Sequence, residues 1–175
     1  MHLNSDDRCA VFVDGANNHA AVRDLGIAVD YARLRRLFAQ RTRLMRTFYY
    51  TAVPSDQEYA PIRPLLDWLD YNNWSVVTKP TKEQTDIQGH RRTKGDMDVD
   101  IAIDVMELAP RLEQVVLFSG DGDFTRLIEH VQRRGVHAIV VSTLRSPQPM
   151  IADELRRRAD EFIELEDLRP EIERK

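Results

Sequence analysis

Short apolar runs of strand length alternate with longer amphipathic segments along this chain, and this alternation restricts its fold more than any other feature. The clearest runs are CAVFVD at 9–14, VVLFS at 115–119 and VHAIVVS at 136–142. Amphipathic segments between such runs are typical of β-α units that build a parallel sheet. The sequence therefore predicts an α/β fold in a single domain over residues 1–175.

The remaining elements can be placed from the same periodicity. Asp30 is the expected N-cap of a helix that runs through Gln40, and a second helix is expected at 59–71 with Pro61 in its first turn. The polar and basic segment 79–95 is expected to form a loop or a short hairpin. Other helices are expected at 99–108, at 124–134 with Gly135 at the C-cap and near 150–158, and other strands at 44–53, 74–78 and 162–165.

The composition excludes several classes of protein. Cys9 is the one cysteine in 175 residues, so an internal disulfide cannot form and no oxidising compartment is needed. The first residues, MHLNSDDR, are polar and lack the apolar region of a signal peptide. The longest apolar runs are far shorter than the ~20 residues of a membrane-spanning helix. We therefore exclude the secreted, disulfide-stapled and transmembrane classes and expect a cytoplasmic protein.

The charges are unevenly distributed along the chain, although the net charge is only −4. Residues 31–53 contain six arginines and no acid, but arginines on a solvated helix face are commonplace. A second basic island precedes a run of aspartates and consists of His90, Arg91, Arg92 and Lys94. Neighbouring charges of opposite sign neutralise each other unless a third partner binds. This basic island is therefore expected to contact the phosphates of a substrate.

Two acidic motifs follow predicted strands at their carboxyl ends. The first, VDGANN, contains Asp14, and the second, FSGDGDF, contains Asp121 and Asp123. In an open parallel sheet, ligands bind beyond the carboxyl ends of the strands, so the two motifs are expected to meet at one edge. One such motif is ordinary because Asp is a common helix N-cap, whereas two that converge indicate a functional site.

A third group of acids, in KGDMDVDIAID, begins a predicted helix. Asp100 and Asp104 are four residues apart and share one face of that helix. Asp96, Asp98 and Asp100 have the ligand spacing of an EF-hand loop. Ile101 occupies the position that needs glycine in such a loop, so an EF-hand is not expected.

Acids gathered in one pocket require a compensating charge. Two carboxylates about 5 Å apart repel by about 3 kcal/mol at an effective dielectric constant near 20, so several together either bind a divalent cation or have raised pKa values. A donor set of oxygens, without a Cys or His cluster, favours Mg²⁺ or Mn²⁺ over Zn²⁺. Such an ion activates water and clamps a phosphodiester.

Four segments together are similar to one known family. FVDGANN, KGDMDVDIAID, FSGDGDF and the late ADEFIELEDL have the order and spacing of the NYN domain in its LabA-like branch, which belongs to the PIN-like nucleases. The resemblance extends over nearly the whole chain, with a core at about 9–168. It implies a three-layer α/β/α sandwich with a mainly parallel central sheet. It also implies a metal-dependent ribonuclease, and an endonuclease rather than an exonuclease.

The resemblance assigns roles to individual acids. The family's catalytic carboxylates, which would hold Mg²⁺ or Mn²⁺, correspond to Asp14, Asp98, Asp121 and Asp123. Asp96, Asp98 and Asp100 offer three registers for the helix ligand, and Asp98 is preferred because it keeps the spacing to Asp104.

Polar neighbours complete the predicted site. Asn17 and Ser119 correspond to the family's amide and strand-end serine, and would orient the metal ligands. Arg91, Arg92 and Lys94 would contact the phosphates of RNA without reading its sequence.

Three other functions are weighed against this one. The first is a catalytically idle RNA-binding or regulatory scaffold of the same fold. A haloacid-dehalogenase-like phosphatase also has an Asp after its first strand, but Ala16 stands where its general acid should be. A dinucleotide-binding domain would need a third glycine after Gly120 and Gly122, where this chain has Thr125. The class of RNA, DNA as a substrate, the number of ions and a homodimer are left open by the sequence.

Overall fold

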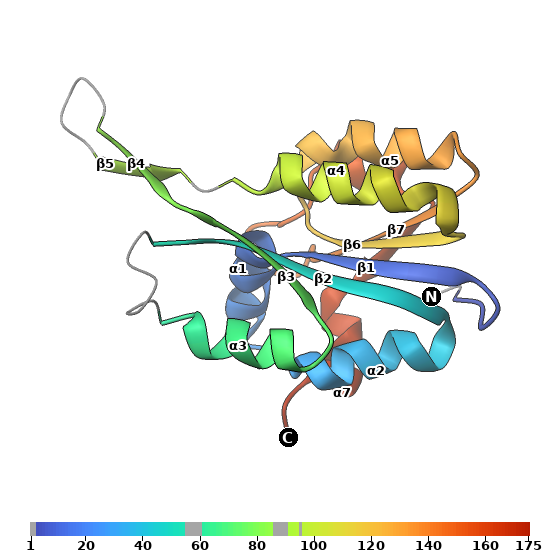
Figure 1. Ribbon diagram of the computed structural model, residues 1–175, viewed down its shortest axis with the longest axis horizontal. Coiled ribbons are helices and arrows are strands. Elements are labelled where there is room, and N and C mark those ends of the chain that lie inside the picture. The colour runs from blue at the N-terminus through green and yellow to red at the C-terminus, as the bar shows by residue number, and fades with distance from the viewer. Residues whose placement is uncertain (1–2, 55–60, 86–90, 95) are drawn as a thin grey trace.

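Six parallel strands form the central sheet, in the order β3-β2-β1-β6-β7-β8 (Figure 1). The structure is a computed structural model that describes residues 3–54, 61–85, 91–94 and 96–175. The strands of this sheet are β1 (Arg8–Asp14), β2 (Arg43–Val53), β3 (Ser75–Pro80), β6 (Gln114–Phe118), β7 (His137–Ser142) and β8 (Glu161–Glu164).

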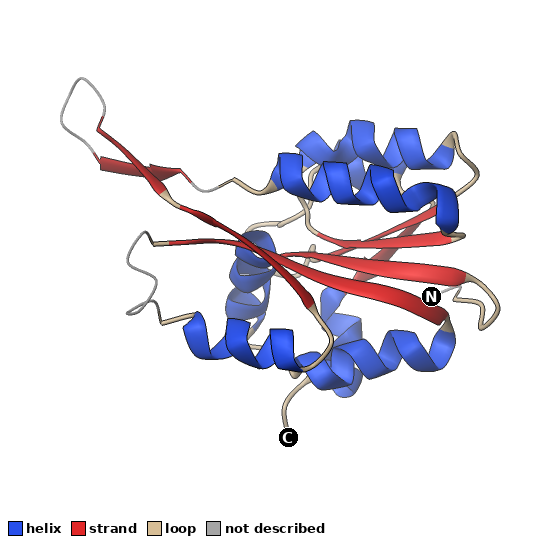
Figure 2. Ribbon diagram, viewed as in Figure 1, coloured by secondary structure: helices blue, strands red, loops and turns tan. Residues whose placement is uncertain are grey.

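Helices cover both faces of the sheet and complete a three-layer α/β/α sandwich, as predicted (Figure 2). Strand β1 shows why two layers form, because Val11 and Val13 enter one apolar core and Phe12 enters the other. One layer contains α1 (Gly15–Leu25), α2 (Tyr31–Arg41), α3 (Arg63–Tyr71) and α7 (Arg169–Ile172). The other contains α4 (Asp98–Leu108), α5 (Thr125–Gln132) and α6 (Asp153–Arg158). Short 3₁₀ turns are η2 (Ala109–Arg111), η3 (Gly122–Phe124) and η4 (Leu165–Leu168).

The strand order reverses between β1 and β6. The chain adds β2 and β3 on one side of β1, then returns to place β6, β7 and β8 on the other. Helix α1 follows β1 into one layer, whereas η3 and α5 follow β6 into the opposite layer. The carboxyl ends of β1 and β6 therefore lie at a topological switch point, where loops diverge and leave room for a ligand.

Most predicted elements agree with the structure to within a few residues, but α3 begins later than expected, and α1 and α7 were not expected. Helix α1 was not expected, since its sequence opens with glycine and two asparagines and its N-cap, Asp14, has the appearance of a strand-end acid. Helix α3 begins at Arg63 with Pro64 in its first turn, so Pro61 precedes the helix rather than starting it. Residues 59–60 of that prediction lie outside the described residues. Within the described part of the chain, no helix is long and apolar enough to cross a membrane.

The basic segment after β3 forms an antiparallel hairpin of β4 (Lys82–Thr85) and β5 (Arg91–Lys94), one of the two predicted outcomes. The hairpin extends beyond the edge of the sheet at which β3 ends (Figure 1). Backbone pairing aligns Lys82 with Lys94 and Gln84 with Arg92. His90, predicted as part of the basic island, lies outside the described residues.

Two arginines of α2 hold the end of the chain in place. The Arg33 guanidinium donates hydrogen bonds to the carbonyls of Glu171, Glu173 and Pro170 at 2.9, 2.7 and 2.9 Å. Arg41 forms an ion pair with Glu171 at 2.5 Å. Part of the arginine-rich segment 31–53 therefore stabilises the fold by fastening α7 to α2.

Replacing Arg33 should destabilise the fold because three carbonyl groups lose a charged donor. We expect Arg33→Ala to lower the free energy of unfolding by about 2 kcal/mol, and the melting temperature by about 4–8 °C. Arg36→Ala, an exposed position on the same helix, is the matched control. Equal melting temperatures for the two variants in thermal denaturation would show that the hydrogen bonds of Arg33 contribute nothing to stability.

Candidate active site

Asp14 joins the ends of β1 and β6 across the switch point. Its Oδ1 accepts a hydrogen bond from the Asn17 backbone N–H at 3.2 Å and caps α1. Its Oδ2 accepts a hydrogen bond from the Ser119 hydroxyl at 3.0 Å. The side chain is buried, and this burial raises the pKa of the Asp14 carboxyl above its ordinary value despite both hydrogen bonds.

The loop after β6 is held against the start of α1. The Gly120 N–H donates to Asn17 Oδ1 at 3.0 Å, and the Asp121 N–H donates to Ser119 Oγ at 3.3 Å. A Cβ atom on Gly120 would lie 1.6 Å from the Met150 carbonyl oxygen, so this position requires glycine for close packing. Asn17 and Ser119 thus hold the loop that carries Asp121 and Asp123.

Three carboxylates converge beside this loop. One oxygen from each of Asp98, Asp121 and Asp123 can be chosen so that the three lie within 4.8 Å of one another. Asp121 Oδ1 accepts from the Asp123 N–H at 2.9 Å and caps η3. Asp96 Oδ1 accepts from the Asp98 N–H at 2.8 Å at the start of α4. Backbone hydrogen bonds from two separate segments therefore set the arrangement of the acids.

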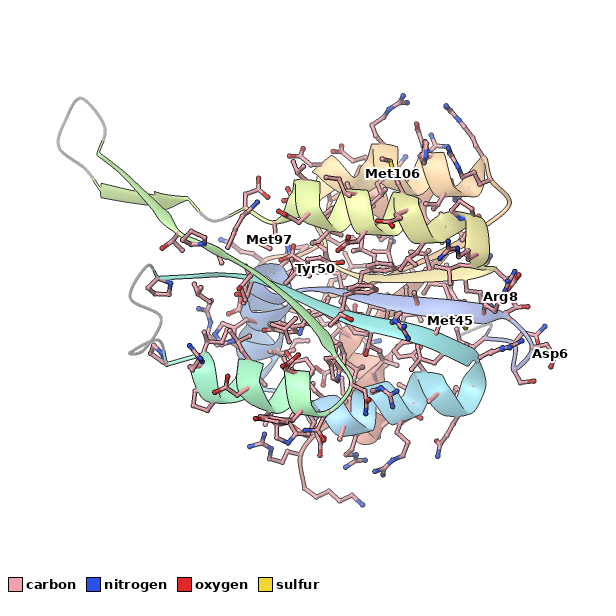
Figure 3. All side chains as sticks on the ribbon, viewed as in Figure 1. Asp6, Arg8, Met45, Tyr50, Met97 and Met106 are labelled. Atoms are coloured by element: carbon pink, nitrogen blue, oxygen red, sulfur yellow. The ribbon has the colours of Figure 1, made fainter. Side chains whose placement is uncertain are left out.

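The other acids of α4 have structural partners. Asp100 forms an ion pair with Lys79 Nζ of β3 at 2.5 Å, and Asp104 accepts from the Tyr50 hydroxyl of β2 at 2.8 Å. Burial and this hydrogen bond raise the pKa of Tyr50, which keeps the hydroxyl protonated as a donor. Figure 3 shows Tyr50 on β2 and Met97 at the start of α4. These contacts fasten α4 to the sheet and leave Asp98 to meet Asp121 and Asp123.

The converging carboxylates repel one another. The pKa of Asp98 is raised to about 7, first by partial burial, then by the neighbouring Asp96, and further by the charges of Asp121 and Asp14. A cation placed among these groups would favour the ionised form. Three carboxylate donors with no nitrogen or sulfur among them fit Mg²⁺ or Mn²⁺. Asp14 adds its charge nearby, but it lies outside the 4.8 Å group and both its oxygens accept hydrogen bonds.

The acids open into a groove between α4 and α5 with a volume of about 510 Å³. Acidic residues, including Asp98 and Asp123, lie at one end, and basic residues of α5 lie along it. Sequence reasoning missed these basic residues, because isolated arginines on a helix are a common surface feature. Arg91, Arg92 and Lys94 lie on β5, and their side chains are outside the described part of the structure.

This fold and this arrangement of strand-end acids have relatives among known proteins. The sequence profile of the NYN domain matches residues 8–166. The chain belongs to the NYN domain family. It is 36% identical over 171 residues to the low amplitude and bright protein LabA of Synechococcus elongatus, a match that covers 95% of this chain and 88% of that protein.

A solved structure agrees with this assignment. The crystal structure of a protein of unknown function from Vibrio parahaemolyticus matches with a TM-score of 0.76 and 27% identity, over 95% of this chain and 98% of that one. The predicted resemblance to LabA-like NYN proteins is confirmed, and so is the PIN-like fold. This NYN domain thus combines a nuclease-type fold with a cluster of three acids at its switch point.

Repulsion at Asp98 should make stability depend on pH when divalent ions are chelated. Between pH 4 and 7 the Asp98 carboxyl ionises in the unfolded chain, whereas in the folded protein, where its pKa is about 7, it keeps its proton. Rising pH therefore favours the unfolded state. After allowance for solvent screening, we expect Asp98→Asn to stabilise the chelated protein at pH 8 by about 1 kcal/mol, or about 2–4 °C in melting temperature. The difference should vanish at pH 4.

The same melting temperatures, measured with a divalent ion present, test whether these acids bind a cation. Saturating Mn²⁺ should raise the melting temperature of the wild type at pH 8 more than that of Asp98→Asn, because binding stabilises the folded state. Identical pH profiles for the two proteins, with no response to Mn²⁺, would contradict a cation site at these acids.

Proposed function

We propose that this NYN domain is a metal-dependent ribonuclease that hydrolyses phosphodiester bonds within RNA. The observation that carries the proposal is the convergence of Asp98, Asp121 and Asp123 at the switch point of a PIN-like fold. The exposed side chains of Asp121 and Asp123 support an endonuclease, because a chain can reach an open site without presenting a free end.

The acids would hold Mg²⁺ or Mn²⁺, with Asp98, Asp121 and Asp123 as ligands and Asp14 as a fourth carboxylate beside them. When bound, such an ion polarises a phosphoryl oxygen and lowers the pKa of a coordinated water. The Ser119 hydroxyl and the Asn17 amide hold the loop of Asp121 in place through the hydrogen bonds described above.

The β4–β5 hairpin is proposed to hold RNA near these acids. Arg91, Arg92 and Lys94 form β5, which is followed within a few residues by Asp98 at the start of α4. Cations at this place would offset the repulsion between substrate phosphates and the acidic site.

Loss of one acid should abolish cleavage and leave the fold intact. We expect Asp121→Asn to reduce divalent-dependent cleavage of an RNA pool by at least about 100-fold, the usual cost of removing a group that stabilises charge in the transition state. Asp14→Asn should have a similar effect. Asp24→Asn, an exposed acid in the last turn of α1, is the matched control.

The same assay separates the proposed function from its alternative. Fragments sequenced after incubation with Mn²⁺ or with chelator would reveal internal cleavage only when the ion is present. Purified protein that binds RNA but cleaves no pool with any divalent ion would favour a catalytically idle scaffold. Cleavage by Asp121→Asn at the wild-type rate would point to a contaminant or to another site.

The proposed role of the hairpin leads to a separate prediction for RNA binding. In the Asp121→Asn background, where substrate is not consumed, replacing Arg91 and Arg92 by Ala should weaken binding evenly across RNA sequences. Two lost phosphate contacts should make the plot of log affinity against log salt shallower by about 1.4, or 0.7 for each contact with a single strand. The thermal response to Mn²⁺ is the control and should not change. An unaltered slope would remove the hairpin from the RNA path.

A further inference from the structure

A cluster of arginines lies on the layer of α5 and α6, beyond the acidic end of the groove. Glu129 of α5 pairs with Arg126 at 2.5 Å, with Arg158 at 3.0 Å and with Arg133 at 3.9 Å. Three positive charges thus surround one negative charge, which leaves the cluster with a net charge of +2. One glutamate cannot neutralise this cluster, so it retains the capacity to bind an anion.

The cluster is arranged to present its charges outward. Glu129 has only 16% of its side chain exposed, whereas Arg126 and Arg133 are 79% and 71% exposed. The partly buried Glu129 carboxylate therefore holds the arginines in place, while Arg126 and Arg133 keep most of their side-chain surface in solvent. Guanidinium groups suit phosphate because their planar set of donors can bind two oxygens at once.

The groove connects this cluster to the acids. Asp123 and Arg126 both line it and are three residues apart, and Arg133, the C-cap of α5, lies about two helical turns beyond Arg126, or about 10 Å away. Helices α4 and α5 lie side by side in this layer (Figure 1). A strand whose reacting phosphate sits at Asp98 and Asp123 would reach the arginines by continuing along the groove.

The opposite wall of the groove is apolar. Val99, Ala102 and Met106 of α4 line it together with the basic residues of α5, and Val99 and Met106 are 67% and 42% exposed. Figure 3 shows Met106 on α4. These side chains can contact riboses and base edges but offer no hydrogen-bonding pattern. Of the two aromatic residues described along the groove, Phe124 is buried and cannot stack on a base, whereas the half-buried His130 has a ring that can stack on any base. Neither phosphate contacts nor such stacking depends on base identity.

We propose that the α4–α5 groove and the arginines around Glu129 form a second substrate-binding surface, which holds the single-stranded RNA next to the bond that is cut. This inference rests on the proposed ribonuclease function and adds the path of the substrate. Phosphates bind Arg126 and Arg133, and the riboses lie against the apolar side of α4. The surface lies on the helical layer and is separate from the β4–β5 hairpin.

The test measures binding without cleavage. A short fluorescent oligouridylate is titrated by anisotropy against the Asp121→Asn protein, with and without Arg126→Ala and Arg133→Ala, over a range of salt concentrations. We expect the double change to weaken affinity about tenfold, and to make the salt slope shallower by about 1.4. Arg126→Lys with Arg133→Lys should recover most of the slope, because charge is retained. Arg36→Ala, on the opposite layer, is the control and should bind as the parent does.

A second measurement locates the strand. An oligonucleotide containing 4-thiouridine, crosslinked by light and analysed by mass spectrometry, should attach to exposed residues of the groove such as Met106 and Val99. An unchanged slope in the double-alanine protein, with crosslinks elsewhere, would overturn the proposal. So would a change in oligomeric state alone, which would assign the groove to a second copy of the chain. Binding that depends on the arginines, in a protein whose wild type cleaves no RNA, would keep this surface and refute the ribonuclease.

Discussion

The hydrogen bond from the Ser119 hydroxyl to Asp14 links the two halves of the sheet where the strand order reverses. The other contacts of the site are built around it. Asp14 also caps α1, which carries Asn17 to the amide of Gly120, and Ser119 also accepts from the amide of Asp121. The direction of α1 and the course of the loop after β6 are therefore coupled. The positions of Asp121 and Asp123 follow from this coupling rather than from the loop alone.

Helix α4 divides its acids between two purposes. Asp100 and Asp104 have partners on β3 and β2, and they fasten the helix to the sheet. Asp98 faces other carboxylates instead, and its raised pKa records the cost of that placement. The contacts of Asp100 and Asp104 with the sheet thus keep Asp98 close to the other carboxylates, although the repulsion between them is unfavourable. Such local conflict is expected at a functional site, where the surrounding structure maintains an arrangement that would not form by itself.

The sequence was informative where its signals were local. Apolar runs placed the strands because a buried strand needs little else to be recognised, and the strand-end acids could be assigned to one edge from sheet topology. Helix α1 escaped prediction because Asp14 serves as cap and strand-end acid at once. The partners of Arg33 and the partners of Glu129 come from distant segments, so no local pattern could distinguish an arginine that fastens a helix from one that is free to bind phosphate. The spacing to Asp104 favoured Asp98 over Asp96 and Asp100, but it could not reveal the ion pair of Asp100 with β3 or the closeness of Asp98 to the acids after β6.

Gly120 has a consequence for how the GDGD segment should be interpreted in other sequences. Its backbone lies so close to the Met150 carbonyl that no side chain fits, and this packing does not involve the neighbouring carboxylates. The glycine and the aspartates of one short segment therefore meet separate physical requirements. A relative that had exchanged both aspartates for neutral residues would still need this glycine to fold. The glycine thus carries information about packing, and only the acids carry information about chemistry.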